Sequence, residues 1–355
     1  MSIDLQSSSD LSKTEWDKNL DKIGGFSLYH THDQVNFYIK TSDKIKNLSF
    51  FCFLNKEPIA FTPLGLTSHK TFNTLSFNQY PCHVSIINKN LIPRTRRKVE
   101  EVIYKKINNI IDEKKIKYAD FFYHPIVINN KVTLNYEDSF SILKYFDVKI
   151  NSINSSFVNL SERMQILESK LQRSLRKEIN NEVYQKLNLI IVDKNLNTNE
   201  IDSFIDKARY IHFENAKKET RNLDSWEFMK VRIKTGSSTL FFLENNKNLI
   251  AYLWCTEIKG VFASAASQAS TKNKFYLDNS VRFYLEWCAI NFYNKKKFKF
   301  YEVGQHYYFN QNWMNISSKQ KRIGLSKLKF GGSIYPRHYF RYESNNNVFK
   351  NNEYI

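Results

Sequence analysis

Glycine and proline are scarce in this chain of 355 residues, which contains 9 Gly and 6 Pro. A collagen-like protein or a loop-rich all-β protein needs far more of both, so these classes are excluded. Hydrophobic residues make up 42% of the chain, including 28 Phe and 21 Tyr, and such a composition is incompatible with disorder of the whole chain. The length is sufficient for two domains, each with its own core.

Cysteines are few and isolated. None of the four forms a Cys-x-x-Cys pair, which excludes a zinc ribbon and a dithiol redox motif. Cys52, Cys255 and Cys288 stand in apolar runs and are expected to be buried in a protein of a reducing compartment. The first ten residues are polar and acidic, unlike a signal peptide, and no apolar run is as long as a membrane span. We therefore expect a cytoplasmic protein without a transmembrane segment.

Several catalytic signatures are missing as well. His-Glu-x-x-His and Cys/His clusters are absent, so no metal site is expected. The Walker loop, Gly-x-Gly-x-x-Gly and Gly-x-Ser-x-Gly are also absent, which argues against nucleotide hydrolysis, dinucleotide binding and α/β-hydrolase chemistry.

Positive charge, in contrast, is abundant. Lys and Arg outnumber Asp and Glu by 53 to 35, a net charge of +18. Such a surplus attracts polyanions: tRNA or another nucleic acid, an anionic membrane surface, or an acidic carrier protein. Part of the surplus carries no functional information, because Lys, Asn, Ile, Phe and Tyr are enriched together, as an AT-rich genome would produce on any surface.

The hydrophobic pattern predicts the same succession of elements twice: a β-hairpin, an amphipathic helix and a strand. In the first half these are residues 47–66 with a turn at 55–58, residues 94–115, and residues 116–124. In the second half a helix at 161–187, a strand at 187–193 and a helical region at 198–234 come first. A hairpin at 238–270 that turns at Lys259–Gly260, a helix at 277–294 capped by Asp278, and a strand at 298–304 follow.

A short internal repeat supports this duplication. KKIKYAD at 114–120 and KKFKFYE at 296–302 each follow a predicted helix, and they end at Asp120 and Glu302. The pattern predicts a flexible lead-in at 1–22, an N-terminal domain at 23–155, a C-terminal domain at 156–345 and a tail at 346–355.

Four segments resemble a known family. They are SLYHTHDQVNFY at 27–38, LQRSLRKEINNE at 171–182, the stretch at 223–255, and FYEVGQ at 300–305 followed by RIGLSKLKFGGS at 322–333. In this order they resemble the tandem GNAT acyltransferases of the Fem-like, peptidyltransferase-like kind. One departure is Ser326, which stands where the family has a phenylalanine before its lysine.

The resemblance implies an α/β (α+β) fold of two GNAT-like domains, each a mixed, mostly antiparallel sheet flanked by helices. It also implies an N-acyltransferase whose C-terminal half is active and whose N-terminal half, which lacks a counterpart of the KFGGS motif, is a scaffold. Transfer of an acyl group to an amine requires positioning, uptake of a proton and stabilisation of an oxyanion. A splayed strand with free backbone N–H groups would serve the last requirement.

Three residues are the catalytic candidates. Glu302 is expected at the C-terminal end of a central strand, where it would handle the proton or position the amine; alternatively it is a solvated strand end. His306 titrates near neutral pH and is a candidate base, although its aromatic neighbours favour a structural or stacking role. Lys327 is expected to bind a phosphate or a carboxylate; the alternative is a surface lysine.

Two further groups complete the predicted site. Substrate binding is expected from residues that leave the strand or belong to the closing motif, together with one hairpin residue: Gln305, Tyr307, Phe330, Gly331, Gly332 and Trp254. The two glycines would allow close backbone approach to a ligand. Donor phosphates are expected to bind the basic residues Arg173, Arg176, Lys177, Lys319 and Arg322; for the face formed by the first three, solvation is the alternative.

The donor remains open. Acetyl-CoA-dependent GNAT proteins have a glycine-rich pyrophosphate loop, but the matching residues 267–280 contain no glycine. No tightly bound cofactor is expected, and the acyl donor is acyl-CoA bound in an altered way, acyl carrier protein or aminoacyl-tRNA.

Three functions follow. The first is acylation of an amino sugar or cell-surface glycan precursor in polysaccharide biosynthesis, favoured because residues 161–187 are too short for the paired helical arm of Fem proteins. The second is an aminoacyl-tRNA-dependent transferase acting on a peptidoglycan precursor of the cell envelope. The third is a non-catalytic basic module that binds nucleic acid or another anion.

Overall fold

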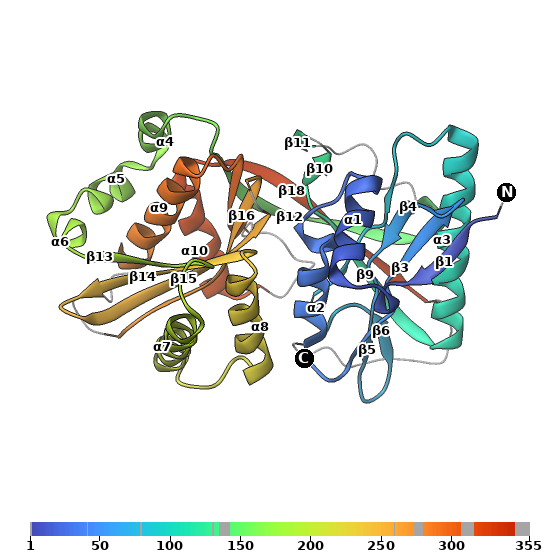
Figure 1. Ribbon diagram of the computed structural model, residues 1–355, viewed down its shortest axis with the longest axis horizontal. Helices are drawn as coiled ribbons and strands as arrows, with labels where there is room; N and C mark the ends of the chain where they lie inside the picture. The colour runs from blue at the N-terminus through green and yellow to red at the C-terminus, as the bar shows by residue number, and fades with distance from the viewer. Residues whose placement is uncertain are drawn as a thin grey trace. The chain divides into compact units, whose positions relative to one another are not determined.

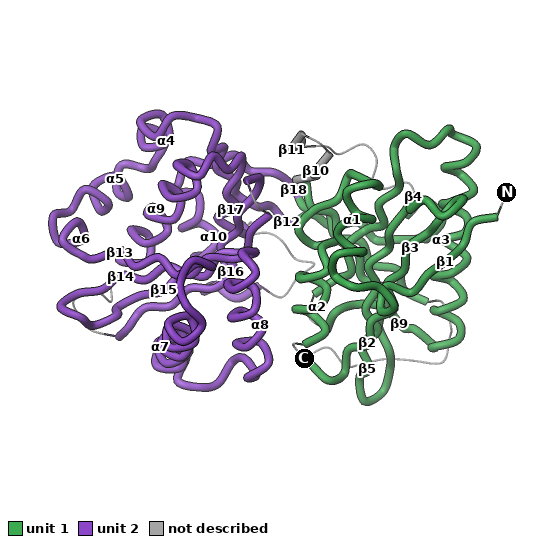
Figure 2. The backbone as a smooth tube through the Cα atoms, in the orientation of Figure 1, with its two compact units in different colours: residues 1–152, 337–355 green, residues 153–336 purple. Residues whose placement is uncertain are grey.

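The computed structural model describes residues 2–40, 42–78, 80–129, 131–134, 143–258, 260–272, 280–306 and 316–344. The chain divides into two compact units, unit 1 with residues 1–152 and 337–355, and unit 2 with residues 153–336 (Figure 2). The sequence placed a boundary three residues later and did not predict that the last strand returns to unit 1. Each unit combines sheets with helices, as expected for an α/β fold (Figure 1).

The described residues of unit 1 form strands of two larger sheets, one small hairpin and three longer helices. The helices are α1 (Lys13–Ile23), α2 (His32–Lys40) and α3 (Pro93–Glu113). The small sheet has the order β1-β3-β4-β8, with β1 (Asp4–Ser7), β3 (Phe50–Leu54), β4 (Glu57–Thr62) and β8 (Ile86–Ile87). The other strands follow the order β2-β5-β6-β9, with β2 (Ile45–Asn47), β5 (Gly65–Ser68), β6 (Asn73–Leu75) and β9 (Ile116–Tyr123). Two partners pair with β9 as well: β7 (Cys82–His83) and residues 338–343 of β18 (Ser333–Glu343). A separate hairpin joins β10 (Ile126–Asn129) to β11 (Lys131–Leu134).

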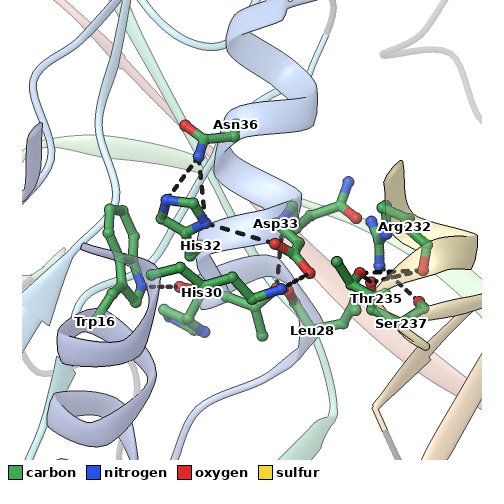
Figure 3. Close-up of polar contacts among 12 residues, drawn as sticks. Trp16, Leu28, His30, His32, Asp33, Asn36, Arg232, Thr235 and Ser237 are labelled. Atoms are coloured by element: carbon green, nitrogen blue, oxygen red, sulfur yellow. Dashed lines mark hydrogen bonds and ion pairs between the residues drawn. The ribbon is translucent and has the colours of Figure 1, made fainter. Parts of the chain in front are cut away.

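Residues 2–23 are folded, which corrects the expected flexible lead-in. Helix α1 begins with a capping box, in which Ser12 accepts a hydrogen bond from the Glu15 N–H and the Glu15 carboxylate accepts one from the Ser12 N–H. Trp16, Leu20 and Ile23 all lie in the core of unit 1. The Trp16 indole N–H donates to the carbonyl oxygen of His30 at 3.0 Å (Figure 3).

Other predictions for unit 1 are confirmed. Asn55 and Lys56, with φ of 50° and 67°, form a two-residue turn between β3 and β4. Helix α3 buries Val99, Ile103 and Ile107 at the spacing that predicted it. Pro58, expected within the turn, lies in β4 instead.

Unit 2 contains a six-stranded arrangement in the order β13-β14-β15-β16-β17-β12. The strands are β13 (Asn188–Val192), β14 (Ser238–Asn245), β15 (Asn248–Ile258), β16 (Phe262–Ser270), β17 (Phe300–His306) and β12 (Val148–Asn159), the last of which begins in unit 1. Pairing is antiparallel except between β16 and β17. The helices are α4 (Met164–Lys170), α5 (Arg173–Ile179), α6 (Glu182–Gln185), α7 (Thr198–Ala216), α8 (Leu223–Lys234), α9 (Ser280–Lys295) and α10 (Ser318–Lys327).

Two predicted helices of unit 2 are broken. The segment 161–187 forms three short helices rather than one. Helices α4 and α5 are separated because Leu171 and Gln172 are extended and the Gln172 N–H donates to the carbonyl oxygen of Lys329 at 2.9 Å. Helix α6 begins anew after Asn181, which is extended and caps it by accepting from the Val183 N–H. The region 198–234 forms α7 and α8, which are separated after Lys217 adopts a left-handed conformation. The predicted cap Asp278 lies outside the described residues.

Helices cover both faces of this sheet. Side chains of α9 share a core with Leu253 and Cys255 of β15 and with Tyr301 of β17. Helices α7 and α8 contact the strands as well, and Tyr252 and Trp254 alternate with the α9-facing residues of β15, so they point to the α7–α8 face. None of the helices in the described parts of the chain has both the length and the apolar composition needed to cross a bilayer.

Candidate functional site

Strands β16 and β17 separate in the middle of the sheet of unit 2. Their parallel ladder consists of three residue pairs, from Phe262 with Phe300 to Ser264 with Glu302. Beyond this point β16 remains paired with β15 as far as Ser270, and β17 remains paired with β12 as far as His306. The strands therefore open into a V, with Ser264 and Glu302 at its apex.

A β-bulge lies just beyond the apex on β16. Trp254 pairs with Ser267 and Cys255 pairs with Ala265, so Ala266 is an extra residue with no partner in the ladder. Ala266 is exposed although its strand is otherwise largely buried. The bulge thus places an exposed residue at the opening between the strands.

Glu302 is buried at the apex, with 1% of its surface exposed. Two hydroxyl groups donate to its carboxylate: Ser155 at 2.5 Å to Oε1 and Ser264 at 3.2 Å to Oε2. The expectation of a strand end was wrong, because β17 continues for four residues after Glu302. It is the parallel ladder that ends at Glu302, and not the strand.

A second bulge determines the direction of the neighbouring side chains. Phe157 pairs with Glu302 and Ser156 with Gly304, so Val303 is the extra residue of β17. Gln305 pairs with Ser155, and alternation along β12 therefore places Gln305 on the same face as Glu302.

His306 is buried and pairs with Asn154, which places it on the opposite face from Glu302. The structure therefore places the predicted catalytic pair Glu302 and His306 on different faces of β17. Tyr307 lies outside the described residues.

The counterpart of Glu302 in unit 1 has a different environment. Asp120 of β9 accepts two hydrogen bonds from the guanidinium of Arg341 in β18, at 2.6 and 2.8 Å. This bidentate ion pair occupies both carboxylate oxygens. The described donors to Glu302 include the hydroxyl groups of Ser155 and Ser264, which have no counterpart among the two Asp120 contacts given above.

Lys327 lies beside β17 at the end of α10. A Cβ atom at Gly304, which has φ of 124°, would lie 2.5 Å from the Lys327 ammonium nitrogen, so the end of the lysine side chain lies against the Gly304 backbone. Burial raises the pKa of Glu286 in α9 to about 7, while the positive charge of Lys327 acts in the opposite direction. The hydroxyl of Tyr301 donates to Glu286 at 3.5 Å.

Sequence reasoning missed Glu286, Ser155 and Ser264. A signal for Glu286 existed, since the acid stands between Leu285 and Trp287 in a helix that is otherwise mostly apolar. Ser155 and Ser264 gave no signal, because nothing in the sequence indicates which serine lies opposite Glu302.

The closing motif packs within the protein itself. Phe330 is buried in the core of unit 2 and contacts Phe283 edge to face. A Cβ atom at Gly331 would overlap the carbonyl group of Lys170, and one at Gly332 would lie 2.6 Å from the carbonyl oxygen of Phe157. The close backbone approach predicted for the two glycines is therefore made to neighbouring protein backbone, and the described contacts of these three residues are structural.

Trp254 also has a packing role. It is buried on β15, and the guanidinium of Arg232 lies over its ring, 5.8 Å from the centroid. Arg232 is itself fixed at the end of α8, where it donates to the carbonyl oxygen of Ser237 at 3.2 Å (Figure 3).

The predicted donor-binding residues divide into two groups. Arg176 donates to the carbonyl oxygens of Ser169 and Leu171 at 2.5 and 3.1 Å, so it joins α5 to the end of α4 and does not present a free guanidinium. The other four are exposed on α5 and α10: Arg173, Lys177, Lys319 and Arg322.

Neither protein-family models nor curated protein sequences match this chain. Solved structures do. FemX superposes with a TM-score of 0.63 at 10% identity, covering 96% of this chain and 98% of FemX. L-PGS from Bacillus licheniformis gives 0.59 at 10% identity over 95% and 93% of the two chains. A tandem GNAT protein from the clavulanic acid biosynthesis pathway gives 0.52 at 7% identity over 96% and 98%. The protein therefore has the double-GNAT, Fem-like fold.

Proposed function

We propose that unit 2 is an N-acyltransferase that moves an acyl or aminoacyl group onto an amine. The opening between β16 and β17 beyond Ser264 and Glu302 is the observation that carries the proposal. It combines the exposed residue Ala266 at the bulge with a buried carboxylate at the apex. The likeness to FemX and to a tandem GNAT protein agrees with this reaction class.

The residues would act as follows. The donor carbonyl lies at the bulge, where main-chain N–H groups stabilise the oxyanion that forms when the amine attacks. The new C–N bond forms, and the bond from the carbonyl carbon to the donor oxygen or sulfur breaks. Glu302, held by Ser155 and Ser264, positions the amine and takes up its proton. Lys327, beside Gly304, offers a positive charge to a donor phosphate or carboxylate.

We propose the amine of an amino sugar or cell-surface glycan precursor as the acceptor. Helices α4, α5 and α6 of seven, seven and four residues replace the single helix predicted at 161–187, so this segment does not form a long paired arm. A segment made of short helices suits a small acceptor molecule, because it does not form the extended surface that a large acceptor would need. The donor is an acyl-CoA bound without a glycine-rich loop, an acyl carrier protein or an aminoacyl-tRNA.

An aminoacyl-tRNA-dependent reaction on a peptidoglycan precursor is the second candidate. It is favoured by the exposed cations Arg173, Lys177, Lys319 and Arg322 and by the net charge of +18. Affinity for unfractionated tRNA that falls steeply between low and moderate salt supports this candidate, because each phosphate contact releases counterions. Affinity that does not change with salt contradicts it.

The test is a transfer assay with the full chain. Acyl-CoAs, loaded acyl carrier protein and aminoacyl-tRNA are each combined with glucosamine or a nucleotide-linked amino sugar, and the amide product is detected by mass spectrometry. We expect one donor class to yield product and Glu302→Gln to lower kcat/KM at least about 100-fold, the scale of one acid–base group.

The matched control is Glu257→Gln in β15. Glu257 is another largely buried acid of unit 2, bound by Thr239 and Tyr293. It does not lie at the apex, so this variant should retain transfer. Full activity in Glu302→Gln would remove Glu302 from the mechanism, and no amide with any donor would contradict the proposed function.

A further inference from the structure

Four side chains of unit 2 form a continuous chain of hydrogen bonds on the α7–α8 face. Thr220, in the loop after α7, lies 2.6 Å from Nε2 of His212. Nδ1 of His212 lies 2.7 Å from the hydroxyl of Tyr252, which lies 3.0 Å from the hydroxyl of Ser267. The chain runs from an exposed loop residue to a buried serine of β16.

The inner end of this chain adjoins the candidate site. Ser267 follows the exposed, bulged residue Ala266 directly. It pairs with Trp254 and contacts Tyr252, so it points to the same face as Ser264, which donates to Glu302. The outer end is open, because His212 is half-buried and Thr220 is exposed.

The state of the imidazole sets the direction of every bond. A neutral His212 has one N–H donor, and with Nε2–H donating to Thr220 its Nδ1 accepts from the Tyr252 hydroxyl. Tyr252 then accepts from Ser267, whose free lone pair is available to accept a proton at the bulge. In a protonated His212 both ring nitrogens donate, so Tyr252 must donate to Ser267 and the serine hydroxyl becomes a donor.

The surroundings favour the neutral ring. The pKa of His212 is lowered by burial and then by the positive charge of Arg221, while Glu219 acts in the opposite direction and is itself paired with Arg209 at 2.8 Å. Trp226 of α8 contacts the ring edge to face. Burial raises the pKa of Tyr252, which keeps its hydroxyl protonated as a relay requires.

We propose that Ser267, Tyr252, His212 and Thr220 form a proton relay from the Ala266 bulge to solvent. This relay rests on the proposed function, and it supplies the route by which a proton released from the acceptor amine reaches solvent. Before it attacks, the acceptor ammonium gives one proton to Ser267, whose own proton passes to Tyr252, and the proton of Tyr252 passes to Nδ1 of His212. The neutral amine then attacks, and Glu302 takes up the second proton, which the nitrogen loses after the C–N bond forms. The imidazolium releases its Nε2 proton along Thr220 to water, so no proton is gained or lost by the relay.

The relay is tested without any substrate, by Ser267→Cys and alkylation with iodoacetamide between pH 6 and 9. A relay that withdraws the thiol proton raises the thiolate fraction and hence the alkylation rate. We expect His212→Gln in the Ser267→Cys background to slow alkylation at pH 7.5 about fivefold, the equivalent of one hydrogen bond, although residue 212 does not contact residue 267. Tyr252→Phe in the same background should have a similar effect.

Two controls accompany this measurement. The native chain gives the blank, since burial raises the pKa values of Cys52 and Cys82 to about 12 and of Cys288 to about 11. Tyr293→Phe replaces a tyrosine by phenylalanine on the α9 face, where the Tyr293 hydroxyl bonds to Glu257. In the Ser267→Cys background this variant should leave the alkylation rate unchanged. An alkylation rate that is independent of His212, or a thiol at position 267 that never reacts, overturns the relay.

Activity supplies a separate readout. With the donor and amino sugar that give an amide in the transfer assay, His212→Gln should remove the acid limb of the kcat/KM profile and lower its plateau about tenfold. A chain that shows coupled alkylation but transfers nothing contradicts the proposed function and leaves the relay geometry supported. Transfer with an unaltered pH profile in His212→Gln contradicts the relay alone.

Discussion

The histidine His30 of unit 1 shows how burial at one residue makes stability depend on pH. Its Nδ1 accepts from the Ser27 N–H at 3.0 Å, and its Nε2 lies 2.9 Å from the carbonyl oxygen of Val84, an arrangement that requires a neutral ring. Burial lowers the pKa of His30 to about 4 from an ordinary value of 6.5. The folded state therefore binds fewer protons than the unfolded state between these values.

We predict that the free energy of unfolding of unit 1 falls as pH decreases from 6.5 to 4. The pKa difference of about 2.5 units, at about 1.4 kcal/mol per unit, corresponds to about 3.5 kcal/mol from His30. Urea unfolding at half-unit steps of pH measures it, and His30→Gln should flatten this slope. An equally steep slope in the variant would assign the effect to other groups, while the wild-type curve above pH 7 should be free of this contribution.

Two glycines with the same backbone angle allow steric overlap to be separated from backbone strain. Gly331 and Gly260 both have φ of 69°, a conformation that costs a side chain about 1 kcal/mol. An added Cβ at Gly331 overlaps the Lys170 carbonyl, whereas at Gly260 no atom lies within 4 Å. We predict that Gly331→Ala destabilises unit 2 by several kcal/mol and Gly260→Ala by about 1 kcal/mol. Equal losses in thermal unfolding would mean that the motif relaxes around the extra methyl group.

At the scale of elements, α1 provides the prediction that differs most from the sequence expectation. A flexible lead-in would tolerate substitution, but α1 has a capping box and buries Trp16. Ser12→Ala should destabilise unit 1 by about 1 kcal/mol, and Trp16→Ala by about 3–5 kcal/mol. Lys18→Ala, on the same helix at an exposed position, is the control and should change chemical denaturation by less than about 0.5 kcal/mol.

Elements with strong periodicity were predictable from the sequence. Helix α3 and strands β9, β14, β15, β16 and β17 all lie where the hydrophobic pattern placed them. The breaks between the helices at 161–187 were not predictable, because they contain no Gly or Pro, and the first of them coincides with pairing of Gln172 with Lys329, more than 150 residues away. Helix α1 was missed because its apolar residues, four and three positions apart, are diluted by charge.

The candidate site was predictable only in part, because the sequence pattern identified single residues but not the strand register around them. Glu302 was identified as a candidate because the repeat aligned it with Asp120, but only the structure distinguishes the two carboxylates. The β-bulges at Ala266 and Val303 have no sequence signature, and they determine which side chains share a face with Glu302. The relay depends on the same register, so His212 and Ser267 could not be associated from their positions 55 residues apart.

At the scale of the whole molecule, the chain is not divided into two consecutive halves. Unit 1 consists of residues 1–152 and 337–355, and unit 2 is the single segment between them. Unit 1 therefore combines two segments that are far apart in the sequence, and its described sheet is completed by residues 338–343, which pair with β9. Folding of unit 1 needs contacts between residues about 220 apart, which favours slow formation of this unit relative to unit 2.

This topology predicts that a chain ending at Pro336 damages unit 1 selectively. Six paired residues would be lost from β9, the buried Phe340 would leave the core, and Asp120 would keep its buried carboxylate without the bidentate Arg341. Removal of one partner of a buried ion pair costs about 3–5 kcal/mol, close to the whole stability of many domains. Hydrogen exchange should therefore accelerate throughout α3 and β4 but remain slow in α9 and β15.

A chain ending at Ser344 is the control, because it retains every described strand and should exchange like the full protein. Equal acceleration in both units would show that they unfold together, whereas no change would mean that β18 contributes little to the first unit.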